Sequence, residues 1–372
     1  MPATSDNSPP GTSPHQLPRR TFLAFCATVA GVLALPVAEA TRVAAALQGV
    51  RRFPVVWLAP QDCTADTESF LRSADPDVLS VLFDVISLDY HETLMVAAGA
   101  SSHTALAAAM ASPDGFVCVV EGAIPQAEGG IYCTIGGRTA LSLVREVTAK
   151  ASLTLAVGAC AVDGGIAAAA PNPTGATGVA GAVPGITNLV NLPGCPANGI
   201  NIVATIVAYL TDRTLPALDS ARRPLFAYQQ KVHGKGRCER FPNLVAGRTV
   251  SAWGDEAHRT GGCLLHMGCR GPSTFANCYQ RNWNEATWPV GAGAPCIGCT
   301  TPGFWDANTP FYVYHDTRPT TSPTPSPTTS PTTSPSPTTS STTDPSPTTS
   351  STPTTPTPSE TTAQPTSERV PS

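Results

Sequence analysis

Cysteine is the residue type in this sequence with the clearest chemical meaning. The chain has 12 cysteines among 372 residues, which is too dilute for a small scaffold held together by disulfides. Six of them crowd into the part of the chain after residue 216, and the last two form a Cys-x-x-Cys pair. These six are Cys238, Cys263, Cys269, Cys278, Cys296 and Cys299. Thiolates at such spacings bind zinc or iron-sulfur clusters, so the sequence indicates a metal-binding protein.

Three chemistries could account for these cysteines. A zinc site needs only four ligands, fewer than the chain supplies. Disulfides would leave one cysteine over, because Cys26 lies in a leader segment and 11 of the 12 then remain. Iron-sulfur clusters use thiolates on each iron, with occasional histidine or carboxylate ligands, and they fit this number best. Iron-sulfur binding is the favoured prediction, with zinc and disulfides as alternatives.

The N-terminus has the features of a twin-arginine export signal. Arg19 and Arg20 precede an apolar run over 22–35, and Ala38-Glu39-Ala40 matches a small-x-small cleavage site. The run is shorter than the roughly 20 residues of a spanning helix, which argues against an uncleaved anchor. Twin-arginine export carries proteins that have already folded and loaded cofactors, so the signal favours metal ligation over disulfides. The predicted location is the periplasm or the outer face of the cytoplasmic membrane.

Composition divides the chain into four predicted segments. Residues 1–40 are the export signal, 41–215 an α/β domain, 216–318 a cysteine-rich domain, and 319–372 a tail of proline, threonine and serine. The tail cannot pack a core and should be extended and polyproline-like; it is either a passive solubilising extension or a tether. A formal net charge of -4 excludes a basic nucleic-acid binder, so no nucleic-acid partner is expected.

The region 41–215 has the pattern of a flavodoxin-like, doubly wound α/β domain. Short apolar runs typical of buried parallel strands alternate with stretches of helical composition. The expected strands are 55–58, 81–86, 116–120 and 153–157, and the expected helices are 68–72, 102–111 and 141–150.

This fold would bring three distant cysteines together. Cys63 follows the first expected strand, Cys160 follows the fourth, and Cys195 follows a further apolar run at 190–192. The carboxyl ends of parallel strands share one edge of a sheet, where ligands collect. After residue 216 the chain is rich in glycine and poor in regular patterning, so bound metal would have to substitute for core burial.

A series of motifs resembles, in order, the small subunit of exported nickel-iron hydrogenases. The motifs are Cys63-Thr64 with 68–72, Gly158-Ala159-Cys160-Ala161 with 171–176, Leu192-Pro193-Gly194-Cys195-Pro196, Trp253-Gly254-Asp255-Glu256, 268–272, and Trp288-Pro289 through Cys296-Ile297-Gly298-Cys299. The resemblance spans roughly 53–306. It implies an electron-transfer subunit of an uptake hydrogenase, which oxidises H2 at a nickel-iron centre on a separate large subunit.

The resemblance also implies a set of cluster ligands. A proximal [4Fe-4S] cluster, nearest the large subunit, would take Cys63, Cys160 and Cys195. The family has its fourth proximal cysteine three residues after the first, and here Asp66 stands at that position. Cys133, in a separate loop, is the alternative fourth ligand. A carboxylate in this place departs from the usual family pattern.

Two more clusters follow from the same comparison. A medial cluster would take Cys278, Cys296 and Cys299. Pro289 stands where a fourth thiolate would be required, which implies a [3Fe-4S] cluster. A distal [4Fe-4S] cluster would take His233, Cys238, Cys263 and Cys269, although the spacing from His233 to Cys238 is two residues longer than the family's usual His-x-x-Cys. The cofactor prediction is therefore two [4Fe-4S] clusters and one [3Fe-4S] cluster.

Two carboxylates near the proximal cysteines could serve as proton relays. Glu121, at a strand end, either carries protons or fixes a loop, and Asp62 stands where the family often has glutamate beside the first cysteine. The resemblance places no other catalytic residue in this chain.

The implied partners are the nickel-iron large subunit, in an obligate heterodimer or a dimer of heterodimers, and a cytochrome b or other redox acceptor. One rival is a secreted, disulfide-bonded wall-associated or binding protein with a Pro/Thr stalk. Another is the cluster-bearing subunit of respiratory NADH dehydrogenases, which has one cluster and lacks the cysteine-rich second half.

Overall fold

The computed structural model describes residues 19–313 apart from 37, 49–51, 75–77 and 284–285. The start of the predicted export signal and the whole predicted tail at 319–372 lie outside the described residues. The predicted division of the chain at residue 215 stays a prediction.

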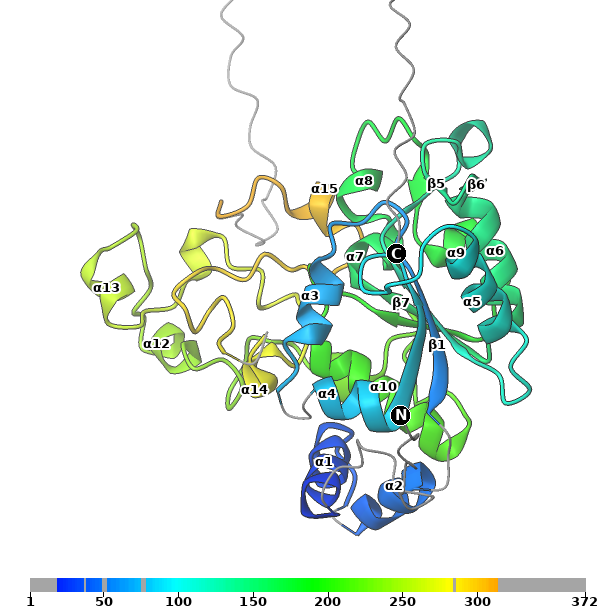
Figure 1. The fold of residues 1–372 in the computed structure, drawn as a ribbon. Helices are drawn as coiled ribbons and strands as arrows, with labels where there is room; N and C mark the ends of the chain where they lie inside the picture. The colour runs from blue at the N-terminus through cyan, green and yellow to red at the C-terminus, as the bar shows by residue number, and fades with distance from the viewer. Residues whose placement is uncertain (1–18, 37, 49–51, 75–77, 284–285, 314–372) are drawn as a thin grey trace, which may run out of the picture. The chain divides into compact units, whose positions relative to one another are not determined.

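A five-stranded parallel sheet lies at the centre of the N-terminal half (Figure 1). Its strand order is β2-β1-β3-β7-β9, and every neighbouring pair is parallel. The strands are β1 Phe53–Leu58, β2 Ile86–His91, β3 Val117–Glu121, β7 Leu153–Val157 and β9 Leu189–Leu192. The order reverses beside β1, as in flavodoxin-like sheets, and the predicted fold class is confirmed.

Helices cover both faces of this sheet because its strands are apolar on both sides. Val55 and Trp57 of β1 pack into one buried cluster, and Val56 and Leu58 pack into another, as the alternation of side chains along a strand requires. The first cluster takes in α1 Arg19–Val32, α2 Glu39–Gln48, α3 Ala65–Leu71, α4 Val78–Ser80 and α10 Gly199–Asp212. The second takes in α5 Ala100–Met110, α6 Ala140–Lys150 and α9 Val179–Ala182.

The strand predicted at 81–86 is wrong. Val81–Val85 forms a short helical turn, η1, and the strand β2 begins at Ile86, which pairs with Phe53 of β1. Val81 and Val85 are both buried, and a spacing of four residues puts them on one face of a helical turn. A short apolar run does not by itself distinguish a buried strand from a buried helix.

The chain after β9 and α10 folds with little regular structure. Its helices are α11 Leu225–Tyr228, α12 Phe241–Val245, α13 Glu256–Arg259, η3 Leu265–Met267, α14 Cys278–Arg281 and α15 Phe304–Asn308. Its buried core is small and includes Cys238 with Trp288, and Cys269, Cys278 and Cys296 pack around it. A core of this size agrees with the expected dependence of this region on bound metal.

The remaining elements are short and lie around the carboxyl edge of the sheet. They are β4 Ile124–Pro125, η2 Ala127–Gly130, β5 Thr134–Ile135, β6 Arg138–Thr139, α7 Gly158–Asp163, α8 Gly165–Ala168 and β8 Ala176–Thr177.

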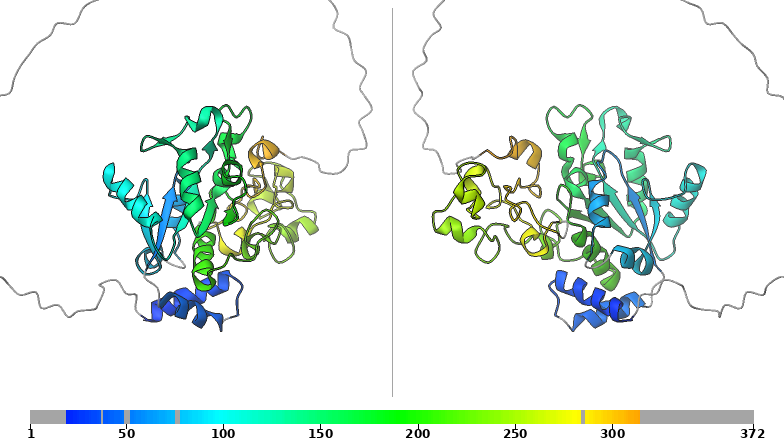
Figure 2. Two further views of the ribbon diagram at one scale, coloured as in Figure 1. Left: turned by 90° about the vertical axis from the view of Figure 1, so that its right-hand side faces the viewer. Right: turned by 60° about the vertical axis from the view of Figure 1, so that its left-hand side comes forward.

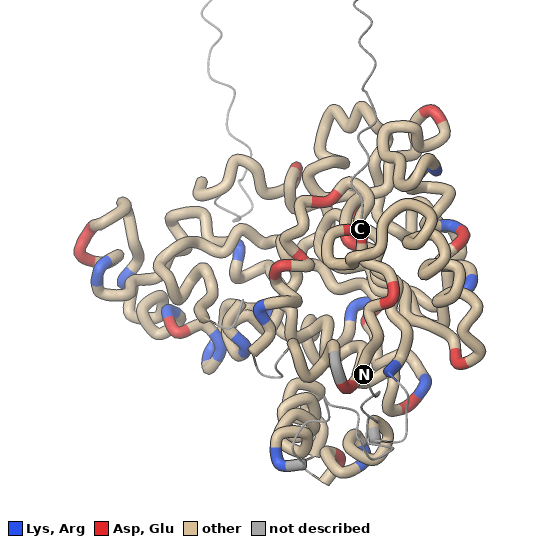
Figure 3. The backbone as a smooth tube through the Cα atoms, in the orientation of Figure 1, with Lys and Arg blue, Asp and Glu red and all other residues tan. Residues whose placement is uncertain are grey.

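Charged residues of both signs are interspersed along the described chain (Figure 3). Of the helices in the described part, none combines the length and the hydropathy that a membrane crossing requires.

Candidate metal centres

The structure gathers the three predicted proximal cysteines at the carboxyl edge of the sheet. Cys63 follows β1, Cys160 lies in α7 directly after β7, and Cys195 follows β9. Burial and the neighbouring Cys195, with smaller contributions from Asp66 and Cys63, raise the pKa of Cys160 to about 12. The four groups are therefore close enough to influence one another. A bound iron would reverse these shifts, because a coordinating thiol is deprotonated.

Asp66 is held as a buried carboxylate beside these thiols. Its side chain is 6% exposed, and its Oδ1 accepts a hydrogen bond of 2.6 Å from the backbone N–H of Ala197. A β-carbon added at Gly158 would lie 2.0 Å from Asp66 Oδ2. Asp66 lies in the first turn of α3, but its side chain makes no cap there. The carboxylate instead occupies a space that only glycine at position 158 leaves open.

Cys133, the alternative fourth ligand, has different neighbours. Burial raises its pKa, and the charges that raise it further belong to Glu92 and Asp62. Its backbone is fixed in a turn, since its N–H donates to Gly130 at 3.3 Å and its carbonyl accepts from Ala140 at 2.9 Å. The influences on Cys160 come instead from Asp66, Cys63 and Cys195. These contacts favour Asp66 over Cys133 as the candidate fourth ligand.

Gly158→Ala is expected to disrupt the proximal site. Gly158 has a φ of +83° and the added methyl would collide with the Asp66 carboxylate, so the carboxylate must move away from the thiols. Gly137→Ala is the matched control, because Gly137 has a φ of +79° with no atom within 4 Å. Both changes carry a similar backbone strain of roughly 1–2 kcal/mol. Iron content and visible absorption should fall in Gly158→Ala only. If both variants retain iron equally, the space beside Gly158 is not needed to position Asp66.

Glu121 joins β1, β3 and α3 through a buried hydrogen-bond network. The side chain is 1% exposed. It accepts from Trp57 Nε1 at 2.9 Å, from the backbone N–H groups of Asp66 at 2.9 Å and Thr67 at 3.1 Å, and from the Thr67 hydroxyl. His91 Nε2 lies 3.1 Å from that hydroxyl. These bonds fix the start of α3, which carries Asp66. The proton-relay role of Glu121 stays a prediction.

Removing the Glu121 carboxylate should destabilise the protein more than neutralising it. Glu121→Ala leaves several buried donors without an acceptor, at a cost of about 3 kcal/mol, or roughly 6–12 °C in the thermal midpoint. Glu121→Gln keeps one acceptor oxygen and should cost less. The measurement is the thermal midpoint of the loaded heterodimer alongside its H2-dependent activity. A Glu121→Gln variant of wild-type stability that has lost activity would instead make Glu121 a proton carrier.

Asp62 closes the turn that leads into α3. Its Oδ2 accepts from the backbone N–H of Thr64 at 2.8 Å and lies 3.2 Å from the Thr64 hydroxyl. Thr64 has a φ of 61°, a left-handed conformation that this turn supports. Cys63, between them, is exposed. The proton-relay role predicted for Asp62 stays a prediction.

The predicted medial residues surround a cavity. Cys278, Cys296 and Cys299 line a cavity of about 100 Å³ together with the proximal Cys195, and Pro289 forms part of the same wall. Burial and the charge of Cys278 raise the pKa of Cys299 to about 12. Because Cys195 belongs to the predicted proximal set, three thiols remain at this cavity for a medial cluster, the number that a three-iron cluster requires.

The predicted distal cysteines also group together. Burial raises the pKa of Cys238 to about 11, and the neighbouring Cys269 and Cys263 raise it further. Cys238 and Cys263 are buried, and Cys269 is partly exposed.

His233 has the properties of an iron ligand. Its Nε2 is buried and has no hydrogen-bond partner. Its ring packs edge-on against Phe241, with centroids 5.1 Å apart. Burial, followed by the charge of Arg237, lowers the pKa of His233, so the imidazole is neutral, the form that binds metal. A β-carbon at Gly271 would lie 3.2 Å from His233 Cβ and 3.5 Å from Cys269 Sγ, which places the histidine beside the distal cysteines.

Two observations connect the three groups of cysteines. Cys195, a proximal residue, lines the same cavity as the medial Cys299. The backbone N–H of the medial Cys296 donates to the Sγ of the distal Cys269 at 3.4 Å. The groups therefore follow one another in the order proximal, medial, distal.

The alternatives to iron-sulfur binding find little support in this geometry. All 12 cysteines are unpaired, contrary to a disulfide-bonded protein. Within the described ranges, no three His, Cys, Asp or Glu side chains are grouped closely enough to hold one metal ion.

A flavodoxin-like sheet with a cysteine-rich lobe defines a class of iron-sulfur electron-transfer subunits. Residues 63–209 match the family described as NADH ubiquinone oxidoreductase, 20 Kd subunit, and residues 228–312 match the family of the C-terminal region of NiFe/NiFeSe hydrogenase small subunits. The second match separates this chain from the NADH dehydrogenase rival, which lacks that half.

Individual relatives agree with the family matches. The periplasmic [NiFe] hydrogenase small subunit 1 of Nitratidesulfovibrio vulgaris is 46% identical over 295 residues, covering 79% of this chain and 92% of the relative. The uptake hydrogenase small subunit of Azotobacter vinelandii is 40% identical, covering 79% and 82%. The [NiFeSe]-hydrogenase structure of Desulfomicrobium baculatum superposes with a TM-score of 0.66 and 34% identity, over 72% of this chain and 100% of that one.

The chain belongs to the family of nickel-iron hydrogenase small subunits. It is therefore one part of an oxidoreductase whose other component is a separate large subunit.

Proposed function

We propose that this protein passes electrons from H2 oxidation through three iron-sulfur clusters to a cytochrome b or another redox acceptor. The observation that carries the proposal is the adjacency of the three cysteine groups, in which Cys195 lines one cavity with Cys299, and the backbone N–H of Cys296 donates to Cys269. When bound, the clusters would supply one-electron redox chemistry. The chain's own part is to hold them in sequence and to set their potentials.

The proposal assigns one group of side chains to each cluster. Cys63, Asp66, Cys160 and Cys195 would hold a proximal [4Fe-4S] cluster. Cys278, Cys296 and Cys299 would hold a medial [3Fe-4S] cluster, and His233, Cys238, Cys263 and Cys269 would hold a distal [4Fe-4S] cluster. Burial and backbone hydrogen bonds to sulfur, such as the one from Cys296 to Cys269, tune the potentials of such sites.

The large subunit would cover the proximal end of this path. Cys63 is exposed at the carboxyl edge of the sheet, so a partner there would shield the proximal site from water. An obligate heterodimer with a large interface follows. Relatives named periplasmic support export, and the paired arginines Arg19 and Arg20 support the twin-arginine route.

Purification together with the large subunit tests this function. The complex should contain iron and nickel, show broad visible absorption that dithionite bleaches, and reduce a dye with H2. A colourless protein without iron would overturn the proposal in favour of a secreted, disulfide-bonded protein.

A further inference from the structure

The predicted leader helix lies against the folded domain. Helix α1 buries Phe25, Cys26 and Val29, each at 5% exposure or less, and Val32 packs in one cluster with Ile200 and Ala204 of α10. Ile200 and Ala204 are one helical turn apart and share a face of α10. Both views of Figure 2 show α1 and α2, in dark blue, beside α10.

The opposite face of the leader helix points to solvent. Arg20 and Ala27 are exposed. The docked helix therefore leaves Arg20 accessible, while its apolar face is covered by the domain. A leader with an uncovered apolar stripe would be an aggregation hazard in a soluble precursor. Docking on α10 removes that hazard without hiding the arginine.

Helix α2 begins inside the predicted cleavage site, at Glu39. Arg42 forms ion pairs with Glu39 on its own helix and with Asp212 at the end of α10. The Thr41 hydroxyl donates to the Ala38 carbonyl at 2.7 Å. Residues 39–42 are therefore helical and tied to the domain, whereas proteolysis favours irregular segments.

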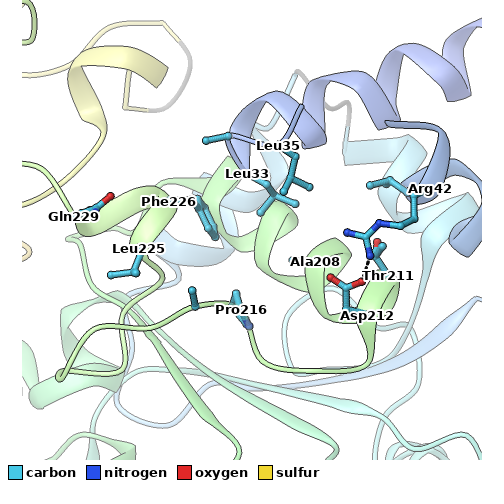
Figure 4. A pocket seen from close by; sticks show the side chains of 13 residues that line it. Leu33, Leu35, Arg42, Ala208, Thr211, Asp212, Pro216, Leu225, Phe226 and Gln229 are labelled. Carbon is cyan, nitrogen blue, oxygen red and sulfur yellow. Dashed lines mark hydrogen bonds and ion pairs between the residues drawn. The ribbon is translucent and has the colours of Figure 1, made fainter. Parts of the chain in front are cut away.

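The packing between the leader and the domain is incomplete. A cavity of about 350 Å³ separates the α1–α2 turn from α10 and α11 (Figure 4). Leu33 and Leu35 line it from the leader side, and Leu225 and Phe226 line it from α11. Side chains facing a void lose dispersion contacts, so less free energy holds the turn in place than close packing would supply.

We propose that residues 19–48 form a releasable latch, in which the leader is stored on α10 of the folded precursor and is protected from cleavage until it lifts away. The latch rests on the proposed export signal at 1–40. Once α1 and α2 are released from α10, a signal peptidase can hydrolyse the Ala40–Thr41 bond. Water completes the new carboxyl and amino termini. Folding of the domain creates the α10 surface, so only a folded precursor stores its leader in this way.

Cys26 reports on the latch in the full-length precursor. Its thiol is 0% exposed, and burial raises its pKa to about 11. Iodoacetamide should therefore modify it only when α1 lifts from the domain. Mass spectrometry of the Cys26 peptide separates this reaction from that of the other cysteines.

Two leader variants form a matched pair. Val29→Asp puts a charge into the contact and should raise the rate of Cys26 modification about tenfold or more over wild type. Ala27→Asp puts the same charge on the exposed face and should leave the rate within about twofold. Neither residue belongs to the predicted mature domain, and unchanged iron content would verify that the domain still folds and loads.

Cleavage by purified signal peptidase completes the test. Val29→Asp precursor should be cleaved after Ala40 faster than Ala27→Asp precursor. If iodoacetamide modifies Cys26 in the folded wild-type precursor as fast as in urea, and the precursor is still cleaved, the latch alone is overturned. If Cys26 stays unmodified and signal peptidase cleaves neither variant, both the latch and the export part of the proposed function are overturned.

Discussion

Replacing Asp66 with cysteine should lower the reduction potential of the proximal cluster and make H2 evolution easier relative to uptake. A carboxylate oxygen donates less electron density to iron than a thiolate does. Exchange of thiolates for harder ligands raises cluster potentials by hundreds of millivolts in other iron-sulfur centres, so a shift on the order of 100 mV is expected for one ligand. Redox titration of the proximal cluster in both proteins measures it.

Two further variants sharpen the Asp66 prediction. Cys133→Ser should leave the proximal potential unchanged, because the neighbours of Cys133 are Glu92 and Asp62 and not the proximal thiols. Asp66→Asn, which removes the anionic ligand in nearly the same volume, should weaken retention of one iron. If Asp66→Cys shifts nothing while Cys133→Ser alters the cluster, Cys133 is the fourth ligand.

Replacing Pro289 with cysteine should convert the medial cluster from three irons to four. Pro289 lines the same cavity as Cys278, Cys296 and Cys299, so a thiol introduced there faces the space where a fourth iron would sit. The spin-half EPR signal of the oxidised three-iron cluster should disappear, and the medial potential should fall. EPR spectra of the oxidised wild type and variant give the comparison.

Pro289→Ala is the control for this conversion. It changes the same backbone position but adds no ligand, so the three-iron signal should survive. A fully loaded wild type that lacks the signal would show that the medial assignment is wrong.

The sequence was sufficient to predict the sheet and the convergence of the proximal cysteines. Apolar runs ending shortly before Cys63, Cys160 and Cys195 predict parallel strands, and parallel strands share a carboxyl edge. The strand β2 was misplaced because Val81 and Val85 satisfy a helical spacing as well as an apolar run.

The features that sequence patterns missed all depend on contacts between distant segments. Gly158 and the backbone N–H of Ala197 enclose Asp66, yet neither has a side chain whose chemistry would mark it. The contact from Cys296 to Cys269 is likewise a backbone hydrogen bond. The docking of α1 on α10 depends on apolar residues that a leader would have in any case.

The role of Glu121 shows how geometry decides between two chemical interpretations. A carboxylate at a strand end near the cysteines is compatible with proton transfer and with loop fixation. The structure gives it hydrogen bonds from Trp57, Asp66 and Thr67, which favour loop fixation. Trp57, in the first strand, was the one signal in the sequence that a buried acceptor would be needed.

The most direct test of an electron path through this protein is EPR of the purified heterodimer before and after exposure to H2. The proposed medial site borders both other groups, because Cys195 lines its cavity and Cys296 donates a backbone hydrogen bond to Cys269. The oxidised sample should show the three-iron signal, which should vanish under H2 and return on reoxidation. An iron-loaded sample whose three-iron signal is absent, or present but unaffected by H2, would contradict the account.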